Sequence, residues 1–195
     1  MAPRTDSHRL AAIVPEQLAR ETTERVLHGL GRYVAPLSPG VTLVLDTRGG
    51  VQASGLYLSI LDLCAWAQRG AGEPEEIPDL TQTIAEAVYP PPLDGSQINR
   101  ALIDVWSSEA DPATPIGLVL FAAKARLHLA DNAAISARQL GALGGCTQDH
   151  VRLLVRRGEI AGTRTGRDVM IRASAARRWL RAREVPGFSA PPRSP

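Results

Sequence analysis

The strongest constraint on the fold is a series of helix caps and glycines between residues 136 and 158. Ser136 and Thr147 each precede a short segment with helical apolar spacing, and such hydroxyls cap helices by accepting a backbone amide proton. Gly144 and Gly145 provide a tight turn between the segments, and Gly158 provides a left-handed residue after the second. The residues expected to face inward are Leu140, Leu143, Val151, Leu154 and Val155. Two short helices joined by a glycine turn form a helix-turn-helix unit.

The residues after Gly158 predict a hairpin. Ile160 begins an extended stretch, and Gly162–Arg167 (Gly-Thr-Arg-Thr-Gly-Arg) has the composition of a turn between two short strands. Val169 and Ile171 then alternate as in a half-buried strand.

A last helix is expected after the hairpin. Ser174 is placed to cap it, and the helix contains Trp179 and Leu180. We expect Trp179 to pack in the core and not to stack on a nucleic-acid base. Residues 186–195 contain four prolines and are expected to form a disordered tail.

Residues 133–183 resemble the excisionase and MerR-type winged helix-turn-helix family. The resemblance rests on Ile135–Leu140 (Ile-Ser-Ala-Arg-Gln-Leu), Thr147–Ile160, a Gly-Arg pair in the hairpin and Ser174–Leu180. It covers about a quarter of the chain, and Gly144-Gly145-Cys146 departs from the usual turn. The resemblance implies that the second helix enters the DNA major groove and that the hairpin, or wing, touches the backbone or minor groove. The family includes regulators, phage and plasmid excisionases and assembly factors.

Charge is divided unevenly along the chain, although its net value is only +2. Residues 1–132 hold 10 basic and 16 acidic side chains, a net charge of −6, whereas residues 133–195 hold twelve arginines and four acidic residues, a net charge of +8. This asymmetry favours a polyanion as the partner of the basic part. The resemblance implies that this polyanion is double-stranded DNA. Tight specific sites usually need two copies of so small a unit, so we expect a homodimer or higher homo-oligomer.

The predicted DNA contacts lie on the second helix and in the wing. Polar side chains near the start of the helix can present donors and acceptors to base edges. The residues expected there are Gln148, Asp149 and Arg152. Other side chains are expected to contact phosphate, which provides affinity without sequence preference. These are Thr147, His150, Arg156, Arg164 and Arg167.

Residues 15–131 predict a helical domain for oligomerisation or partner binding. The first expected helix begins at Pro15, includes Tyr33 and is ended by Pro36, Pro39 and Gly40. The other expected helices are Leu56–Ala67, Pro78–Val88, Ser96–Trp106 and Ile116–Ala130. Val41–Asp46 is a candidate strand, whose partner is either Val51–Tyr57 or another copy of the chain. Residues 1–14 are expected to be a flexible arm, and Asp131–Ile135 a hinge between the two domains.

Several kinds of site lack support in the sequence. Cys64 and Cys146 lie far apart and are expected to be buried small hydrophobic residues, not a disulfide or a metal site. Gly49-Gly50 is not followed by the Lys-Ser or Lys-Thr of a phosphate-binding loop. The histidines are too scattered for a metal set, and no nucleophile is matched with a base. We therefore expect no enzyme activity and no metal or other cofactor.

The sequence thus predicts a mainly α-helical protein with a C-terminal winged helix-turn-helix domain over residues 133–185. The expected function is sequence-specific DNA binding by a transcriptional regulator of bacterial or phage and plasmid type. It is expected in the cytoplasm, associated with the nucleoid when bound to DNA, because we find no long apolar run and no secretory signal.

Three alternatives remain open. The first is an architectural or assembly factor, such as an excisionase, a partition adaptor or a small terminase-like subunit. In the second, the basic part binds the acidic part as a protein interaction module. In the third, the helices at Leu56–Ala67 and Ile116–Leu127 enclose a small-molecule pocket.

Overall fold

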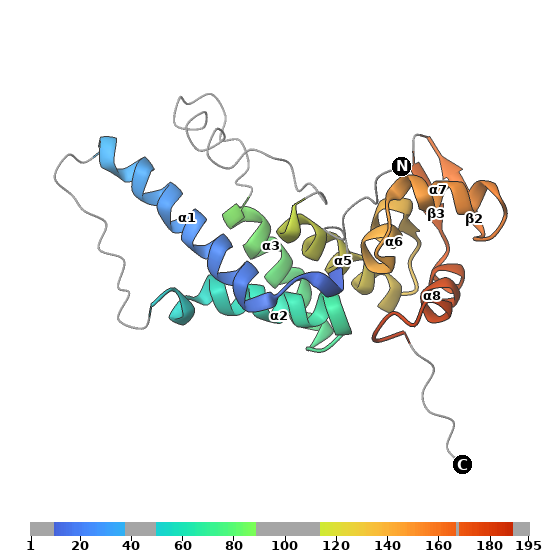
Figure 1. Cartoon of the computed structure of the whole chain (residues 1–195), viewed down its shortest axis with the longest axis horizontal. Coiled ribbons are helices and arrows are strands. Elements are labelled where there is room, and N and C mark those ends of the chain that lie inside the picture. Colours follow the sequence, from blue (N-terminus) through green and yellow to red (C-terminus); the bar gives the residue numbers. More distant parts are fainter. Residues whose placement is uncertain (1–9, 38–49, 89–113, 167, 189–195) are drawn as a thin grey trace, which may run out of the picture.

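The computed structural model describes residues 10–37, 50–88, 114–166 and 168–188, which form a mainly helical structure (Figure 1). The helices are α1 (Pro15–Leu37), α2 (Gly55–Arg69), α3 (Ile77–Val88), α5 (Pro115–Ala130), α6 (Ala137–Gly144), α7 (Gln148–Arg156) and α8 (Ala173–Ala182). Short 3-10 helices span Leu10–Ala12, Val51–Ala53 and Pro74–Glu76. The strands β1 (Ile135–Ser136), β2 (Gly162–Thr165) and β3 (Asp168–Ile171) form an antiparallel sheet in the order β1-β3-β2. The mainly α-helical class expected from the sequence is confirmed.

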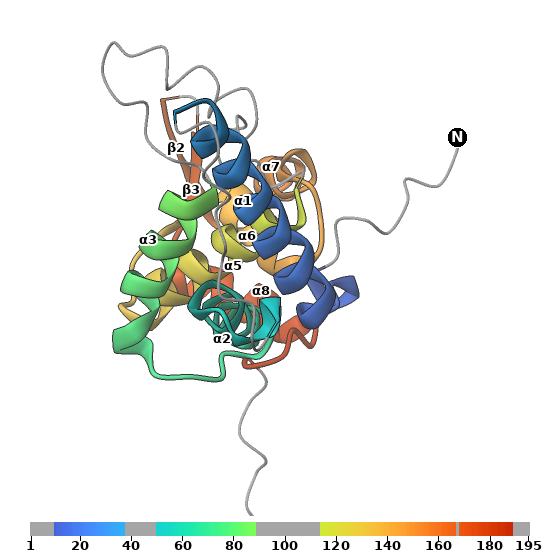
Figure 2. The same cartoon turned by 90° about the vertical axis from the view of Figure 1, so that its left-hand side faces the viewer.

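Helix α5 occupies the middle of the molecule. Helices α2 and α3 pack against it on one side and α6 packs on the other, as the two views in Figures 1 and 2 illustrate. Its buried residues lie on several sides of the helix, among them Ile116, Val119, Ala122 and Leu129. The buried hydrophobic residues of the described chain belong to one core that continues from α1 through α5 into α6 and α8.

The N-terminal helices form where the apolar spacing predicts them. Helix α1 begins at Pro15, buries Leu18, Thr22 and Val26, and ends at Leu37, within the expected stop at residues 36–40. Helices α2, α3 and α5 cover the expected segments within a few residues. The expected helix Ser96–Trp106 and the candidate strand Val41–Asp46 lie outside the described residues. Among the described residues, no helix is long and apolar enough to cross a membrane.

Val51–Tyr57, one of the two alternatives for the partner of the candidate strand, is not a strand. Val51–Ala53 is a 3-10 helix, and α2 begins at Gly55. The reason is a local cap: the Ser54 hydroxyl accepts a hydrogen bond from the Tyr57 backbone N–H at 3.2 Å. A helix N-terminus capped in this way uses the apolar residues that follow for helical packing, not for strand pairing.

The two ends of the described chain are more closely packed than expected. Leu10 is buried, and its carbonyl accepts a hydrogen bond from the Gln68 side chain at 3.0 Å, so the expected flexible arm does not extend to residue 14. The expected disordered tail does not begin at Pro186, because the Pro186 carbonyl accepts from Arg126 at 2.6 Å and Phe188 packs against the core.

The link between α5 and β1 is bridged by a side chain from α8. Arg177 donates to the Asn132 side chain at 3.1 Å and also to the Leu129 carbonyl. Nearby, the Arg138 guanidinium of α6 lies 4.6 Å from the centre of the Phe121 ring of α5. The segment expected to be a hinge is therefore flanked by contacts that join the first helices to the C-terminal elements.

Candidate nucleic-acid interface

Helices α6 and α7 begin with the expected caps. The Ser136 hydroxyl accepts from the Gln139 backbone N–H at 3.2 Å, and the Gln139 side chain accepts from the Ser136 N–H at 2.9 Å. This reciprocal pair is a capping box. In α7, the Thr147 hydroxyl accepts from the His150 N–H at 3.2 Å. The expected left-handed conformation of Gly158 is confirmed, with φ +74°. Of the two glycines expected in the turn, Gly145 follows α6 with φ +64°, whereas Gly144 is the last residue of the helix.

Two glycines of α6 allow the elements around the turn to approach closely. A Cβ atom on Gly141 would lie 2.7 Å from the Cys146 carbonyl oxygen, and one on Gly144 would lie 2.3 Å from the Trp179 ring. No side chain fits at either position without a shift of its neighbours. Trp179 is half-buried against the end of α6, in agreement with its expected role in packing.

The hairpin after α7 has longer strands than predicted. Gly162–Thr165 pairs with Asp168–Ile171, so four residues of the segment expected to be a turn, Gly162–Arg167, belong to a strand instead. Gly166 has φ +60°. The prediction that Ser174 caps the last helix is also wrong: α8 follows β3 directly, with Arg172 in the N-cap position and no side-chain cap bond.

The base of the hairpin packs directly against α7. A Cβ atom on Gly162 would lie 3.1 Å from a Val155 methyl carbon, which places β2 against the helix. Between α7 and the two strands lies a groove with a volume of about 490 Å³. Its lining residues are Asp149, Arg152, Val155, Arg156, Gly162, Arg164 and Val169.

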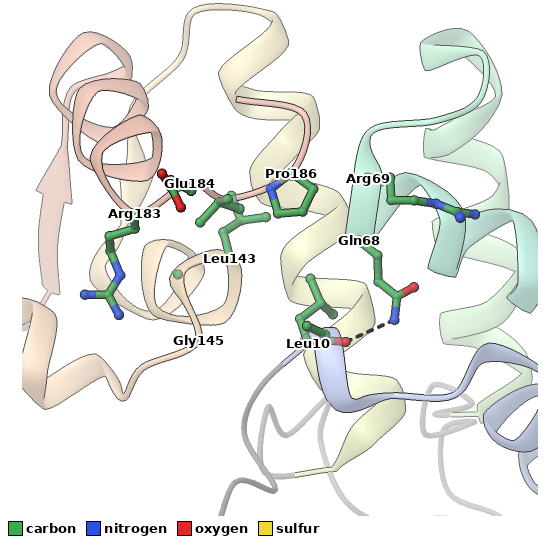
Figure 3. A pocket seen from close by; sticks show the side chains of 11 residues that line it. Leu10, Gln68, Arg69, Leu143, Gly145, Arg183, Glu184 and Pro186 are labelled. Carbon is green, nitrogen blue, oxygen red and sulfur yellow. Dashed lines mark hydrogen bonds between the residues drawn. The ribbon is translucent and has the colours of Figure 1, made fainter. Parts of the chain in front are cut away.

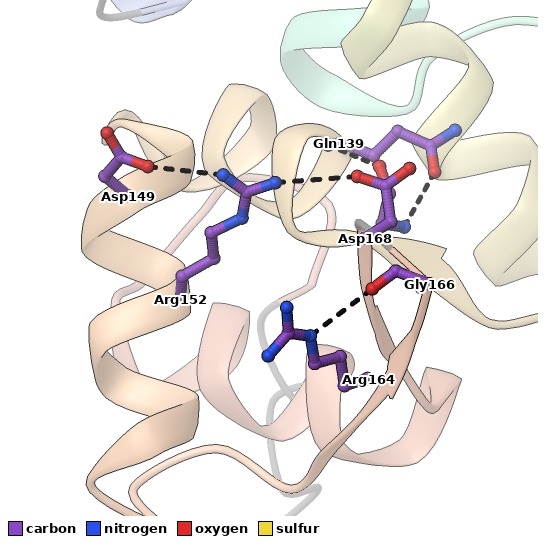
Figure 4. Close-up of polar contacts among 7 residues, drawn as sticks. Gln139, Asp149, Arg152, Arg164, Gly166 and Asp168 are labelled. Atoms are coloured by element: carbon purple, nitrogen blue, oxygen red, sulfur yellow. Dashed lines mark hydrogen bonds and ion pairs between the residues drawn. The ribbon is translucent and has the colours of Figure 1, made fainter.

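Arg152 crosses this groove from α7 toward the hairpin (Figure 4). One amino group lies 3.4 Å from the Asp149 carboxylate on α7, and the other lies 3.7 Å from the Asp168 carboxylate on β3. The exposed fraction is 32% for the Arg152 side chain, 89% for Asp149 and 61% for Asp168. The guanidinium group is therefore half-shielded, while the two carboxylates face solvent.

The groove brings together several of the predicted DNA contacts. Asp149, Arg152, Arg156 and Arg164 line it, and Arg164 donates to the Gly166 carbonyl at 3.3 Å. Arg156 and Arg164 are exposed, as are Thr147 and His150 at the start of α7, where Gln148 is half-buried. Arg167 lies outside the described residues.

Not all arginines of the basic part converge on this surface. Arg138 stacks on Phe121, Arg177 binds the link after α5, and Arg183 lies 4.8 Å from the centre of the Trp179 ring. Arg157 lies 3.9 Å from the Glu159 carboxylate. The net charge of this part therefore overstates the number of arginines at the groove.

Sequence reasoning did not single out Asp168. Two features of the sequence could have drawn attention to it. It is one of four acidic residues among the last 63, and it directly follows the predicted turn. Its proximity to Arg152 depends on how the hairpin folds back onto α7, so the sequence spacing does not reveal it.

A second hollow, of about 370 Å³, lies between the first helices and the C-terminal elements (Figure 3). Leu10, Leu143, Val185 and Pro186 contribute apolar walls. Figure 3 shows the Arg69 and Arg183 side chains extending in opposite directions, away from the space between Leu10 and Leu143. Ligand sites usually have polar groups that converge on the ligand, and these two guanidinium groups diverge.

One alternative from the sequence is a small-molecule pocket between Leu56–Ala67 and Ile116–Leu127. In the structure these two segments are in direct contact. Helices α2 and α5 pack together, and the Trp66 indole donates to the Ala123 carbonyl at 3.2 Å. The hollow in Figure 3 lies instead at the end of α2.

Comparison with known proteins adds no assignment. No family model, no curated protein and no solved structure matches the chain.

Proposed function

We propose that this chain is a sequence-specific DNA-binding protein in which α6, α7 and the β2–β3 hairpin form a winged helix-turn-helix. Its role is that of a transcriptional regulator of bacterial or phage and plasmid type, and it binds its site as a homo-oligomer. The resemblance of residues 133–183 to excisionase and MerR-type domains supports the type of unit. The observation that carries the proposal is the groove in which α7 and the hairpin present Arg152, Arg156 and Arg164 together.

Helix α7 has the surface that a DNA-reading helix needs. Val151 and Leu154 are buried on one side, whereas Asp149, His150 and Arg156 are exposed. The capped N-terminus of α7 leaves its first turn at the surface, and the N-terminal residues of such helices contact base edges.

The arginines at the groove differ in role. Arg156 at the end of α7 and Arg164 on β2 are exposed, and they suit phosphate contacts on either side of the helix. Each phosphate contact lowers the slope of log affinity against log salt by about 0.9. The proposal therefore predicts binding that weakens steeply as salt is raised.

An electrophoretic mobility shift with the full chain tests the proposal. The probe is a pool of random duplexes of about 30 base pairs, long enough for two half-sites one helical turn apart. We expect a retarded complex at low salt and enrichment of a motif after selection. Absence of any retardation at low salt contradicts the proposal.

A charge-matched pair of variants tests the surface. Arg156→Gln with Arg164→Gln removes two exposed cations at the groove, and Arg178→Gln with Arg181→Gln removes two exposed cations from α8. We expect only the first pair to make the slope of log affinity against log salt shallower, by about two. Equal effects of both pairs would show that net charge, and not this groove, binds the DNA.

The selected motif also tests the biological role. Two half-sites related by symmetry or by direct repeat fit an oligomeric regulator. Binding without any enriched motif instead favours the architectural or assembly alternative.

A further inference from the structure

Carboxylates lie beside the arginines of the groove, where a surface built only to bind phosphate would not have them. Asp149 and Asp168 lie on either side of Arg152, at 3.4 and 3.7 Å, and both are more than half exposed (Figure 4). A phosphate that approached Arg152 would also meet these two negative charges. The two carboxylates therefore disfavour a purely electrostatic contact between Arg152 and a phosphate of the DNA backbone.

The two ion pairs act on one guanidinium group from two structural elements. Asp149 belongs to α7 and Asp168 to the hairpin, and each engages a different amino group of Arg152. Exposed ion pairs contribute little stability individually. Together, however, they define the direction in which the planar group lies, and they partly neutralise its charge.

We propose that Arg152 selects a guanine base, and that Asp149 and Asp168 position it and disfavour its binding to phosphate. This inference rests on the proposed function, because it assigns a role within the same groove. The planar guanidinium can donate two parallel hydrogen bonds to O6 and N7 of guanine, a geometry that the rounded ammonium of lysine does not offer. The guanidinium group has five N–H donors, so it can donate to guanine while the carboxylates remain beside it.

The position of Arg152 in α7 agrees with this role. It lies one turn after Gln148, the first residue of the helix, in the part of a reading helix that approaches base edges. The exposed Asp149 carboxylate lies beside it, and a carboxylate is compatible with a base edge because it can accept a hydrogen bond from the cytosine amino group. The same carboxylate repels phosphate, so the pair favours a base over the backbone.

The test is selection from the random duplex pool with the full-length chain and four variants. Arg152→Lys keeps the positive charge and removes the planar group, and Arg152→Gln removes the charge as well. Asp168→Asn removes the hairpin carboxylate. Glu159→Gln is the matched control, because Glu159 is similarly exposed, at 52%, and pairs with Arg157 instead of Arg152.

We expect both Arg152 variants to lose a guanine preference at one position of the motif and to keep the preferences elsewhere. The expected loss of discrimination at that position is about 5- to 150-fold. Arg152→Lys should retain the salt slope of the natural chain. Asp168→Asn should weaken the same guanine preference and tighten binding to the unselected pool, whereas Glu159→Gln should do neither.

The outcomes separate this inference from the proposed function. A motif that persists unchanged in Arg152→Lys and Arg152→Gln overturns the inference and leaves DNA binding intact. So does a Glu159→Gln variant that behaves like Asp168→Asn, since the effect would then be one of net charge. If the natural chain retards no duplex at low salt, both the proposed function and the inference are overturned.

Discussion

The guanidinium carbon of Arg126 lies 4.7 Å from the centre of the Phe188 ring. Arg126 also donates to the carbonyls of Ala67 at 2.8 Å, Gln68 at 3.0 Å and Pro186 at 2.6 Å. Ala67 and Gln68 belong to the last turn of α2, where carbonyls lack partners within the helix. One buried side chain thus caps α2 and holds the segment that follows α8.

The surroundings of Arg126 change its acidity but not its charge at neutral pH. Burial lowers the pKa of Arg126 from 12.5 to about 10, so the group stays protonated. Its cationic charge lies near the C-terminus of α2, where the helix dipole favours positive charge. Arg126 is buried, and the Phe188 ring lies against its guanidinium group.

Phe188→Ala is predicted to destabilise the protein by about 1–2 kcal/mol, because it removes the buried ring area and the contact with the Arg126 cation. Phe188→Leu retains most of the apolar volume and should lose about 0.5–1 kcal/mol. Urea unfolding of the full chain, followed by circular dichroism, measures both. A Phe188→Ala variant as stable as the natural chain would show that the segment after α8 does not contribute to the fold.

Gly144→Ala is predicted to destabilise the protein by about 1–3 kcal/mol, since the added methyl group meets the Trp179 ring at 2.3 Å. Gly55→Ala is the control, because a Cβ atom there meets nothing within 4 Å. It should leave stability unchanged or slightly raised. The midpoints of thermal unfolding of the two variants, each compared with that of the natural chain, measure the difference.

A double-mutant cycle identifies the neighbour responsible. Trp179→Leu removes the ring that opposes Gly144, so the cost of Gly144→Ala should fall markedly in that background. Equal costs in both backgrounds would contradict the packing of Trp179 against the end of α6.

Local features of the sequence predict much of the C-terminal fold. The side chains of Ser136 and Thr147 and the backbone freedom of Gly145 and Gly158 act within a few residues of their own positions. Their effect on helix ends can therefore be inferred from short stretches of sequence. The same reasoning failed at Ser174, because the helix begins as soon as β3 ends.

Contacts between distant segments could not be predicted in this way. Ile135 pairs with Ile171 across the sheet, Arg126 binds Pro186, and Arg152 meets Asp168 only after the hairpin folds back. Each of these contacts depends on how separate elements pack. The sequence thus predicted the arginines of the groove on α7 and in the hairpin. It did not predict that the Asp168 carboxylate lies beside Arg152.

Ionisation of the Cys64 thiol is predicted to lower the stability of the protein as the pH rises. Burial, with a smaller effect from the Glu16 carboxylate, raises the pKa of this thiol from 9.0 to about 12. Above pH 9 the unfolded chain releases the thiol proton before the folded chain does, so ionisation favours unfolding. The loss is about 1 kcal/mol between pH 8 and pH 10.

Cys64→Ala isolates this contribution. The variant should lose less stability than the natural chain between the same two pH values, as measured by urea unfolding. In the folded natural chain, a thiol reagent at pH 8 should modify the half-buried Cys146 before the fully buried Cys64. Rapid modification of Cys64 without unfolding would contradict its place in the core.

Thr147→Ala is predicted to affect both stability and the proposed DNA binding. The change removes the acceptor for the His150 N–H, which should cost about 1 kcal/mol of stability. It should also loosen the first turn of α7, where the side chains proposed to contact bases lie. Thr147→Ser keeps the hydroxyl and should preserve both properties.

Ser54→Ala separates the two effects. Ser54 caps α2 with the same geometry, at 3.2 Å from the Tyr57 nitrogen, but it does not line the groove. Ser54→Ala and Thr147→Ala should therefore lose similar stability, whereas only Thr147→Ala should bind the selected duplex more weakly. If both variants weaken DNA binding equally, the loss follows from general destabilisation, and the first turn of α7 has no particular part in binding.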